Sequence, residues 1–341
     1  MDQDQEQTES GGSHPVLQPG ERLGNFRVTK CICAGLIANY YLVEHVRDLH
    51  EATVGVLHQR ASGSPELTER LDELRKTTHQ MEQEGIPRIR EQQEIHGRIC
   101  LFMDPVEGQS LTQFFAKRGG AGSGLGAEAT SRLLSQMLTL VGYMHSKGLD
   151  HRDMDSELIC IREDGSLRVL GVGLKAALGV DLFEQVVSAS VCPLAGDQPS
   201  DHLNSFDVMS PEYKSGIEED NRVDLYGVGV LGYWLLTGHK PDRKNYKPPS
   251  TFIKGLPAHW DAFFEKMLQR DRDHRYQSCR SALLALRDMD QTPAPTKKMS
   301  IESQIGRVPV PKGVHERGKL AVRMYRSKKS VHSVVPIIAV F

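Results

Sequence analysis

The spacing of apolar and polar residues divides the chain into a first part with strand patterns and a second part with helix patterns. Short runs rich in β-branched and aromatic residues predict strands at residues 25–30, 40–44, 52–58 and 99–103. Apolar residues that recur at steps of three and four predict helices at residues 66–82, 110–118, 127–147, 223–236, 260–270 and 278–288. Residues 223–236 are apolar on nearly every side, which predicts a buried central helix. A small β-rich part therefore precedes a larger helical part.

Composition narrows the class of protein. Of the 341 residues, 39% are hydrophobic and 25% are charged, which is enough apolar material for a large core. The formal net charge of -2 gives no reason to expect a nucleic-acid partner. The chain has no run of 18 apolar residues and no apolar signal-peptide core, and its six cysteines include no CxxC spacing. We therefore expect a cytoplasmic protein without a disulfide or zinc framework.

Both ends of the chain differ from the middle. Residues 1–20 carry four acidic residues and no basic residue, which predicts a disordered acidic tail. Residues 297–329 carry ten Lys or Arg and two acidic residues, a net charge of +8, within a predicted basic linker over residues 290–330. This linker would bind an anionic membrane surface or a protein partner. The apolar residues 331–341 are too few to span a core of ~30 Å, so they are either the start of a truncated transmembrane helix or a soluble tail.

The most informative motif follows the helix predicted at residues 127–147. It reads Gly-Leu-Asp-His-Arg-Asp, and a short hairpin is predicted after it at residues 159–161 and 167–170. Met-Ser-Pro-Glu and then Asp-Leu-Tyr-Gly-Val-Gly-Val follow along the chain, ending at Glu212 and Val230. These motifs, in this order, resemble those of eukaryotic-type Ser/Thr protein kinases, including the bacterial members of that family.

The resemblance implies an α+β, two-lobed kinase-like fold. Its β-rich N-lobe would cover residues 21–103, its hinge residues 104–109, and its larger helical C-lobe residues 110–289. Asp153 matches the catalytic aspartate of the family, and His151 would pack in the core of the lobe.

Four further residues match structural positions of the family. Glu212 and Arg275 match a buried ion pair. Asp224 matches the carboxylate that accepts N–H groups from the catalytic loop. Arg152 would pair with a group of the segment that follows the loop.

The glycine-rich loop departs from the family pattern. Residues 32–41 read Ile-Cys-Ala-Gly-Leu-Ile-Ala-Asn-Tyr-Tyr, so Gly35 remains while Cys33 and Ala38 replace the other two glycines. Side chains at these two positions would crowd the path of the phosphates. We expect an ordinary hairpin with Leu36 and Ile37 at an exposed tip.

The charged groups of phosphoryl transfer are also replaced. Gly55 stands at the position of the phosphate-binding lysine, so Glu73, the helix residue that would pair with the lysine, is expected on the solvated surface. Asp155 replaces the lysine of the catalytic loop, Leu158 the magnesium-binding asparagine, and Gly171 the aspartate of Asp-Phe-Gly. Asp153 would then be vestigial and hydrogen-bonded within its own loop.

The sequence thus favours a pseudokinase that needs no cofactor and acts as a protein-binding or signalling scaffold. Its partner would bind at the pseudoactive cleft or at residues 174–209. The alternative is an atypical Ser/Thr protein kinase that binds ATP and magnesium and uses Arg60 or His58 in place of the lysine. A position on the cytoplasmic face of a membrane would follow from the basic tail.

Overall fold

The computed structural model describes residues 16–58, 65–118, 122–190, 205–217, 219–242 and 244–291. The chain divides into two compact units, Met1–Thr292 and Pro293–Phe341, and every described residue belongs to the first. The apolar tail, nearly all of the predicted basic linker and residues 1–15 lie outside the described residues.

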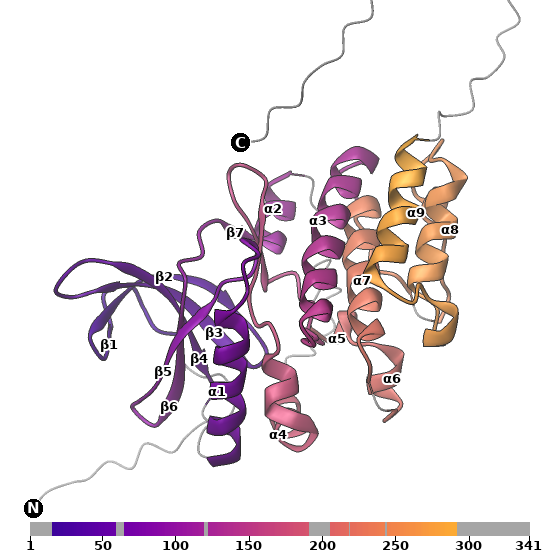
Figure 1. The fold of residues 1–341 in the computed structure, drawn as a ribbon. Coiled ribbons are helices and arrows are strands. Elements are labelled where there is room, and N and C mark those ends of the chain that lie inside the picture. Colours follow the sequence, from indigo (N-terminus) through magenta and orange to yellow (C-terminus); the bar gives the residue numbers. More distant parts are fainter. Residues whose placement is uncertain are drawn as a thin grey trace, which may run out of the picture. The chain divides into compact units, whose positions relative to one another are not determined.

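The first half of the described chain forms a six-stranded antiparallel sheet (Figure 1). In their spatial order the strands are β1 (Arg22–Leu23), β2 (Phe26–Ala34), β3 (Ala38–His45), β4 (Glu51–Leu57), β6 (Arg98–Met103) and β5 (Ile89–Ile95). Helix α1 (Pro65–His79) packs against β5 through its buried leucines. The structure confirms the predicted strands as β2, β3, β4 and β6. The edge strand β5 was not predicted, because the sequence Ile-Arg-Glu-Gln-Gln-Glu-Ile has few apolar residues.

The predicted acidic tail is wrong for its last residues. The N–H of Gly20 donates to the carbonyl of Val28 at 2.8 Å, and the N–H of Leu17 donates to the hydroxyl of Tyr41 at 3.2 Å. Leu17 also packs against the core on this face of the sheet. Residues 16–20 therefore belong to the folded lobe, because they have backbone partners that an acidic composition does not reveal.

The second half is helical, as predicted, and includes a small sheet of β7 (Gln109–Ser110), β8 (Ile159–Ile161) and β9 (Leu167–Val169). Its helices are α2 (Leu111–Arg118), α3 (Ala127–Ser146), α4 (Leu174–Ser190), α5 (Ser205–Val208), α6 (Pro211–Lys214), α7 (Arg222–Thr237), α8 (Ala258–Met267) and α9 (Cys279–Gln291), with 3₁₀ turns at Pro249–Thr251 and Arg272–His274. Helix α7 is buried from Val223 to Thr237 and packs against α3 and α8. Helix α9 extends two residues beyond the predicted lobe boundary at residue 289.

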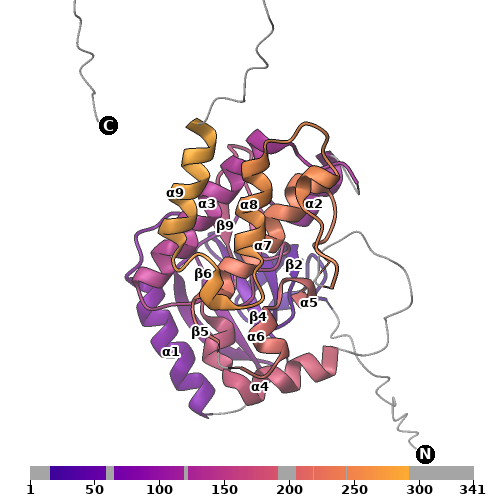
Figure 2. The same ribbon diagram turned by 90° about the vertical axis from the view of Figure 1, so that its right-hand side faces the viewer.

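Helix α4 occupies the start of the segment predicted to contact a partner, residues 174–209. It lies beside α1 in both ribbon views (Figures 1 and 2), and it buries Leu174, Leu178 and Phe183 in the same apolar cluster as leucines of α1. The chain kinks at Gly179, which has φ 75°. No helix within the described ranges is long and apolar enough to cross a membrane.

Candidate functional site: the pseudoactive cleft

Tyr40 occupies the space where a lysine side chain at position 55 would begin. Tyr40 and Gly55 are partners in the register of β3 and β4. A Cβ atom at residue 55 would lie 2.9 Å from Cε1 and 3.3 Å from Cδ1 of Tyr40. Carbon atoms do not approach so closely without a shift of one of them. The absence of a side chain at Gly55 is therefore what gives the buried Tyr40 ring its room.

Tyr40 and Leu158 also surround the magnesium-ligand position at Gly171. A Cβ atom at Gly171 would lie 3.3 Å from Oη of Tyr40 and 3.3 Å from Cδ1 of Leu158. One at Gly35 would lie 3.2 Å from Cδ2 of Leu158. The retained glycine of the phosphate loop, the lysine position and both metal-ligand positions thus converge on Tyr40 and Leu158, which we call the apolar plug.

The glycine-rich loop closes onto this plug. Cys33, Ile37 and Ala38 are all buried in one cluster with Tyr40 and Leu158. The predicted exposed tip is wrong for Ile37, which is 4% exposed, and Leu36 is only partly exposed. The loop folds inward because Leu158 offers an apolar surface where the family has an asparagine.

His58 fastens the loop in this position. Its N–H donates to the carbonyl of Ile37 at 3.1 Å, and its Nε2 lies 3.0 Å from the carbonyl oxygen of Gly35. The His58 ring therefore contacts the loop backbone. In the alternative hypothesis of an atypical kinase, the same ring would bind phosphate in place of the lysine. The other basic residue of that reading, Arg60, lies outside the described residues.

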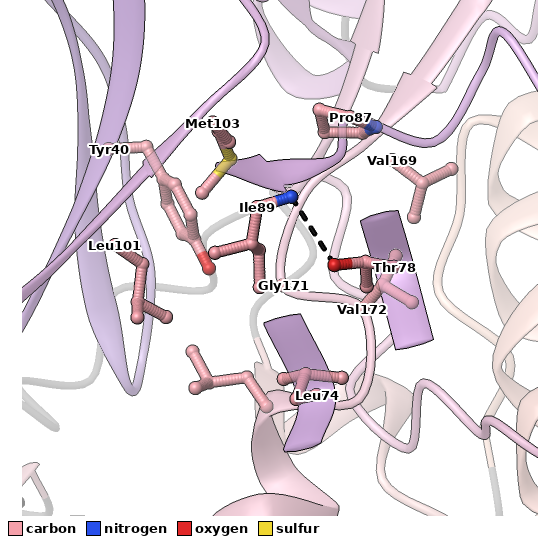
Figure 3. A pocket seen from close by; sticks show the side chains of 11 residues that line it. Tyr40, Leu74, Thr78, Pro87, Ile89, Leu101, Met103, Val169, Gly171 and Val172 are labelled. Carbon is pink, nitrogen blue, oxygen red and sulfur yellow. Dashed lines mark hydrogen bonds between the residues drawn. The ribbon is translucent and has the colours of Figure 1, made fainter. Parts of the chain in front are cut away.

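Behind Tyr40 lies a small cavity of about 20 Å³ (Figure 3). Its lining is Tyr40, Leu74, Thr78, Pro87, Ile89, Leu101, Met103, Val169, Gly171, Val172 and Leu174. This volume is enough for about one water molecule. Burial raises the pKa of the Tyr40 phenol far above its ordinary value, so the ring stays neutral and supplies no charge in place of the lysine.

The hinge is also engaged within the protein. Thr53, on β4 and fully buried, accepts a hydrogen bond at 2.8 Å from the N–H of Val106. The carboxylate of Asp104 accepts from Nε of Arg88 and of Arg90, at 2.9 and 2.6 Å. The N–H of Val106 therefore already has an acceptor within the protein, and it is not available to the adenine ring of a nucleotide lying against the hinge.

The catalytic loop keeps its structural hydrogen bonds. Both oxygens of the buried Asp224 accept backbone N–H groups, from His151 at 2.8 Å and from Arg152 at 2.6 Å, as predicted. His145, which the sequence did not single out, adds a contact at 2.8 Å from Nε2. Burial opposes ionisation of Asp224, but the hydrogen bonds from the His145 side chain and the His151 backbone hold its pKa below its ordinary value. His151 is buried and neutral, because burial lowers its pKa, and its Nε2 donates to the Leu170 carbonyl at 2.7 Å.

Asp153 lies in a buried and acidic environment. Burial, and then the neighbouring carboxylate of Asp155, raises the pKa of Asp153 to about 7, while Lys175 opposes the shift. Its backbone N–H donates to Nδ1 of His151 at 3.2 Å. Its carbonyl oxygen accepts the N–H of Asp155 at 2.8 Å, so Asp153 is hydrogen-bonded within its own loop, as predicted. It is Asp155 that closes the loop, since its Oδ1 accepts the N–H of Glu157 at 3.0 Å.

Lys175 is a buried cation that the sequence analysis missed. Its Nζ lies 3.0 Å from Oε2 of Glu219 and 3.3 Å from the carbonyl oxygen of Arg152. It also lies 4.5 and 4.3 Å from the ring centroids of Phe183 and Tyr213. Helix α4 thereby places a positive charge against the acidic catalytic loop, and two aromatic faces enclose that charge.

Arg152 differs from its prediction. Its guanidinium pairs with Asp150 of the same loop, with Nη2 at 2.9 Å from Oδ2. Its carbonyl oxygen, and not its charged side chain, contacts the following segment through Lys175. Because Lys175 already supplies a cation there, a second positive charge at the same place would be repelled.

The predicted ion pair of the C-lobe is present. Nη1 and Nη2 of Arg275 donate to the two oxygens of Glu212 at 2.6 and 2.7 Å, and both side chains are nearly inaccessible to solvent. Nε of Arg275 donates to the Gln269 carbonyl at 2.7 Å. Glu73, in contrast, lies on the exposed face of α1, as expected without a lysine partner.

The two-magnesium arrangement of phosphoryl transfer does not fit these residues. Magnesium prefers six oxygen ligands in octahedral geometry. Leu158 offers no oxygen and is 3% exposed within the apolar cluster, and Gly171 has no side chain. No step of the chemistry is therefore assigned to a metal ion here.

Comparison with known proteins identifies the family. The family model described as "Protein kinase domain" matches residues 26–285. The chain therefore belongs to the protein kinase domain family, with the two-lobed fold that this implies.

Bacterial proteins named as Ser/Thr kinases are among the proteins similar to this chain. The chain is 26% identical over 296 residues to the serine/threonine-protein kinase Pkn1 of Myxococcus xanthus, covering 79% of this chain and 40% of that protein. It is 23% identical over 223 residues to the serine/threonine-protein kinase PrkC of Bacillus subtilis, covering 65% of this chain and 32% of that protein. The crystal structure of the Mycobacterium tuberculosis PknI kinase domain has a TM-score of 0.59 at 21% identity and covers 80% of this chain and 99% of that domain. The chain thus spans less than half the length of these two curated relatives.

Two residues central to this cleft escaped the sequence analysis. Tyr40 stands two residues after the third glycine position, where the family motif has a valine. Comparing this position with the motif would therefore have revealed a larger side chain than the family has there. Lys175 is one cation in an otherwise apolar stretch, and its partner Glu219 is 44 residues away. Sequence spacing carries no signal for such a pair.

Proposed function

We propose that this chain is a pseudokinase, a kinase-like domain that does not transfer phosphate and acts by binding another protein. The observation that carries this proposal is the apolar plug. Tyr40 lies where a lysine side chain at position 55 would begin, Leu158 stands at one metal position, and both lie 3.3 Å from a Cβ atom at the other, Gly171. Phosphoryl transfer depends on positioning and on neutralising the phosphate charge, and these replacements remove the groups that do both.

The scaffold around the plug is intact, which supports a binding role. The Glu212–Arg275 pair and the hydrogen bonds to Asp224 keep the C-lobe and the catalytic loop in place. A fold retained without its chemistry keeps the capacity to present a surface to a partner. Relatives named as Ser/Thr kinases make an atypical kinase the alternative, with Asp153 as its base.

Nucleotide binding gives the most direct test. We expect no shift of the thermal midpoint with ATP, alone or with magnesium or manganese. The test is sensitive, because a ligand at a hundredfold excess over its Kd would add about 2.7 kcal/mol to the free energy of unfolding. The matched gain-of-binding variant combines Tyr40→Val, Gly55→Lys, Asp155→Lys, Leu158→Asn and Gly171→Asp. Transfer of labelled phosphate by the unmodified chain, abolished by Asp153→Asn, would establish the atypical kinase instead.

The binding half of the proposal needs a separate comparison. Partners captured by the unmodified chain should be captured equally by Asp153→Asn, because this change leaves the fold and surface intact. They should be lost with Arg275→Ala, which removes the partner of the buried Glu212. Loss of the partners with Asp153→Asn alone would contradict a purely structural role for the cleft.

A further inference from the structure

A second group of chemistry-bearing residues lies at the hairpin that joins β3 to β4. Nδ1 of His45 lies 2.6 Å from Oδ1 of Asp48, and Nδ1 of His50 lies 2.7 Å from the same oxygen. The potential ligand atoms of all three residues lie within 4.8 Å of one another. Two imidazole nitrogens thus point at one carboxylate oxygen.

The backbone brings these side chains together. The N–H of His45 donates to the carbonyl of His50 at 2.9 Å, so the two histidines face each other across the end of the hairpin. The N–H of Leu49 donates back to the carbonyl of His45 at 3.0 Å. Leu49 has φ 61°, in the left-handed region, which turns the chain so that His50 returns to the same side as Asp48.

Aromatic packing fixes the orientation of both imidazole rings. Their centroids are 4.9 Å apart with an interplanar angle of 26°, so the rings are stacked. The ring of Phe26 meets both of them edge to face, with centroids 5.1 Å from His45 and 5.5 Å from His50. Phe26 is itself buried against Phe102. The orientation of both imidazole rings is therefore held by Phe26, which is anchored in the core.

The site is accessible to solvent. The side chains of His50 and Asp48 are 54% and 62% exposed, and that of His45 is 18% exposed. An ion can therefore approach this end of the hairpin from solution.

We propose that His45, Asp48 and His50 form a zinc-binding site, with water in the fourth position. Zinc is commonly bound by imidazole nitrogen and carboxylate oxygen in tetrahedral geometry, and three protein ligands with an open fourth position are a known arrangement. Ligand atoms around tetrahedral zinc are about 3.4 Å apart, so the carboxylate oxygen would have to move away from the two nitrogens by about 0.7 Å. The side chain of Asp48 is 62% exposed, so it can make that movement while the two rings keep their packing. A bound ion would join the ends of β3 and β4 on a face of the N-lobe that the cleft chemistry does not use.

Zinc titration of the full chain tests this site, with isothermal calorimetry for Zn²⁺ and visible absorption for Co²⁺ as a spectroscopic substitute. We expect one Zn²⁺ per chain at this site and a Co²⁺ spectrum of tetrahedral type. His50→Ala and Asp48→Asn should each weaken zinc binding by at least about tenfold. The matched control is His274→Ala, because Nδ1 of His274 faces a single carboxylate, that of Asp271, at 3.4 Å. This control should bind zinc as the unmodified chain does.

A second measurement does not depend on variants. Zinc should protect His45 and His50 from modification by diethyl pyrocarbonate, read by peptide mass spectrometry, and should leave His274 reactive. Absence of protection, or affinity unchanged in both His50→Ala and Asp48→Asn, would overturn the proposal. In that case the cluster is only a hydrogen-bonded hairpin end.

Discussion

Lys175 and Glu219 form a buried ion pair, with Nζ 3.0 Å from Oε2 and side chains that are 5% and 11% exposed. This pair connects helix α4 to the residues just before α7, beside the catalytic loop. Its cation also offsets the negative charge of Asp153. The pair therefore ties helix α4 to the catalytic loop and to the residues before α7.

Replacing Lys175 by Met should destabilise the protein by about 3 kcal/mol, because Glu219 would remain buried without its partner. Urea unfolding measures the effect. The matched control is Lys240→Met, because Lys240 pairs with Asp207 at 2.7 Å but both side chains are about 30% exposed, so the loss should stay below about 1 kcal/mol. Equal losses for the two variants would show that burial of the pair is not what matters.

The Tyr40–Gly55 contact predicts strong coupling between the two positions. Gly55→Ala should destabilise the protein by about 1–3 kcal/mol, because the added Cβ would meet Cε1 of Tyr40 at 2.9 Å. In a Tyr40→Val background the same change should cost much less. A double-mutant cycle by denaturant unfolding measures the difference, and additive effects would show that the two side chains do not compete for space.

The raised pKa of Asp153 predicts a pH-dependent gain of stability on its replacement. The folded protein holds the Asp153 proton up to about pH 7, whereas the unfolded chain releases it near pH 4. Ionisation of Asp153 therefore lowers the stability of the folded state as pH rises from about 4 to about 7. Asp153→Asn should be more stable than the unmodified chain by about 2–4 kcal/mol at pH 8 and equal to it at pH 4.

Unfolding free energies at several pH values check this prediction. The control Glu163→Gln removes an exposed carboxylate from the nearby β8–β9 hairpin and should not change the slope. Parallel profiles for Asp153→Asn and the unmodified chain would show that the carboxylate is not strained by its surroundings.

The Glu212–Arg275 pair should behave as a unit. Arg275→Ala should cost about 3–5 kcal/mol, because Glu212 is 4% exposed and its charge would remain buried without a partner. Adding Glu212→Gln to Arg275→Ala should recover part of this loss. Denaturant midpoints for the single and double variants measure the recovery, and a fully additive double variant would refute the pairing.

Truncation after Gln291 tests the basic tail. We expect the full chain to float with anionic liposomes at low salt and the truncated chain not to float, because residues 297–329 carry a net charge of +8. Both should unfold at the same midpoint, since α9 ends at Gln291. Equal flotation of the two, or flotation that persists at high salt, would be inconsistent with electrostatic docking of the tail.

The fold was predictable from sequence because its signals are local. The patterns that predicted α3 and α7, and the motif residues Glu212, Asp224 and Arg275, each lie in a short segment with a recognisable spacing. Strand β5 gave no such signal, because it is a polar edge strand whose pairing with β6 depends on the rest of the sheet.

For the cleft, the sequence predicted only which functional groups of the family are missing. The sequence showed that Gly55, Leu158 and Gly171 lack the groups of the family. It did not show that the Tyr40 ring lies where a side chain at position 55 would begin, because that contact depends on the register between β3 and β4. The inward position of Ile37 was missed for the same reason, since its apolar surface is provided by the other lobe through Leu158.

The packing of Tyr40 against Gly55 also restricts the mutational routes by which the cleft could regain a lysine. A lysine introduced first would have to displace a buried ring, and a smaller residue introduced first at position 40 would leave a cavity. Under the proposed function, neither first step alone would restore phosphate binding, so each would lower stability without a gain that selection could retain. The loss of the lysine is thus held in place by its neighbour, and a return to it would require two changes at once or a stabilising change elsewhere beforehand.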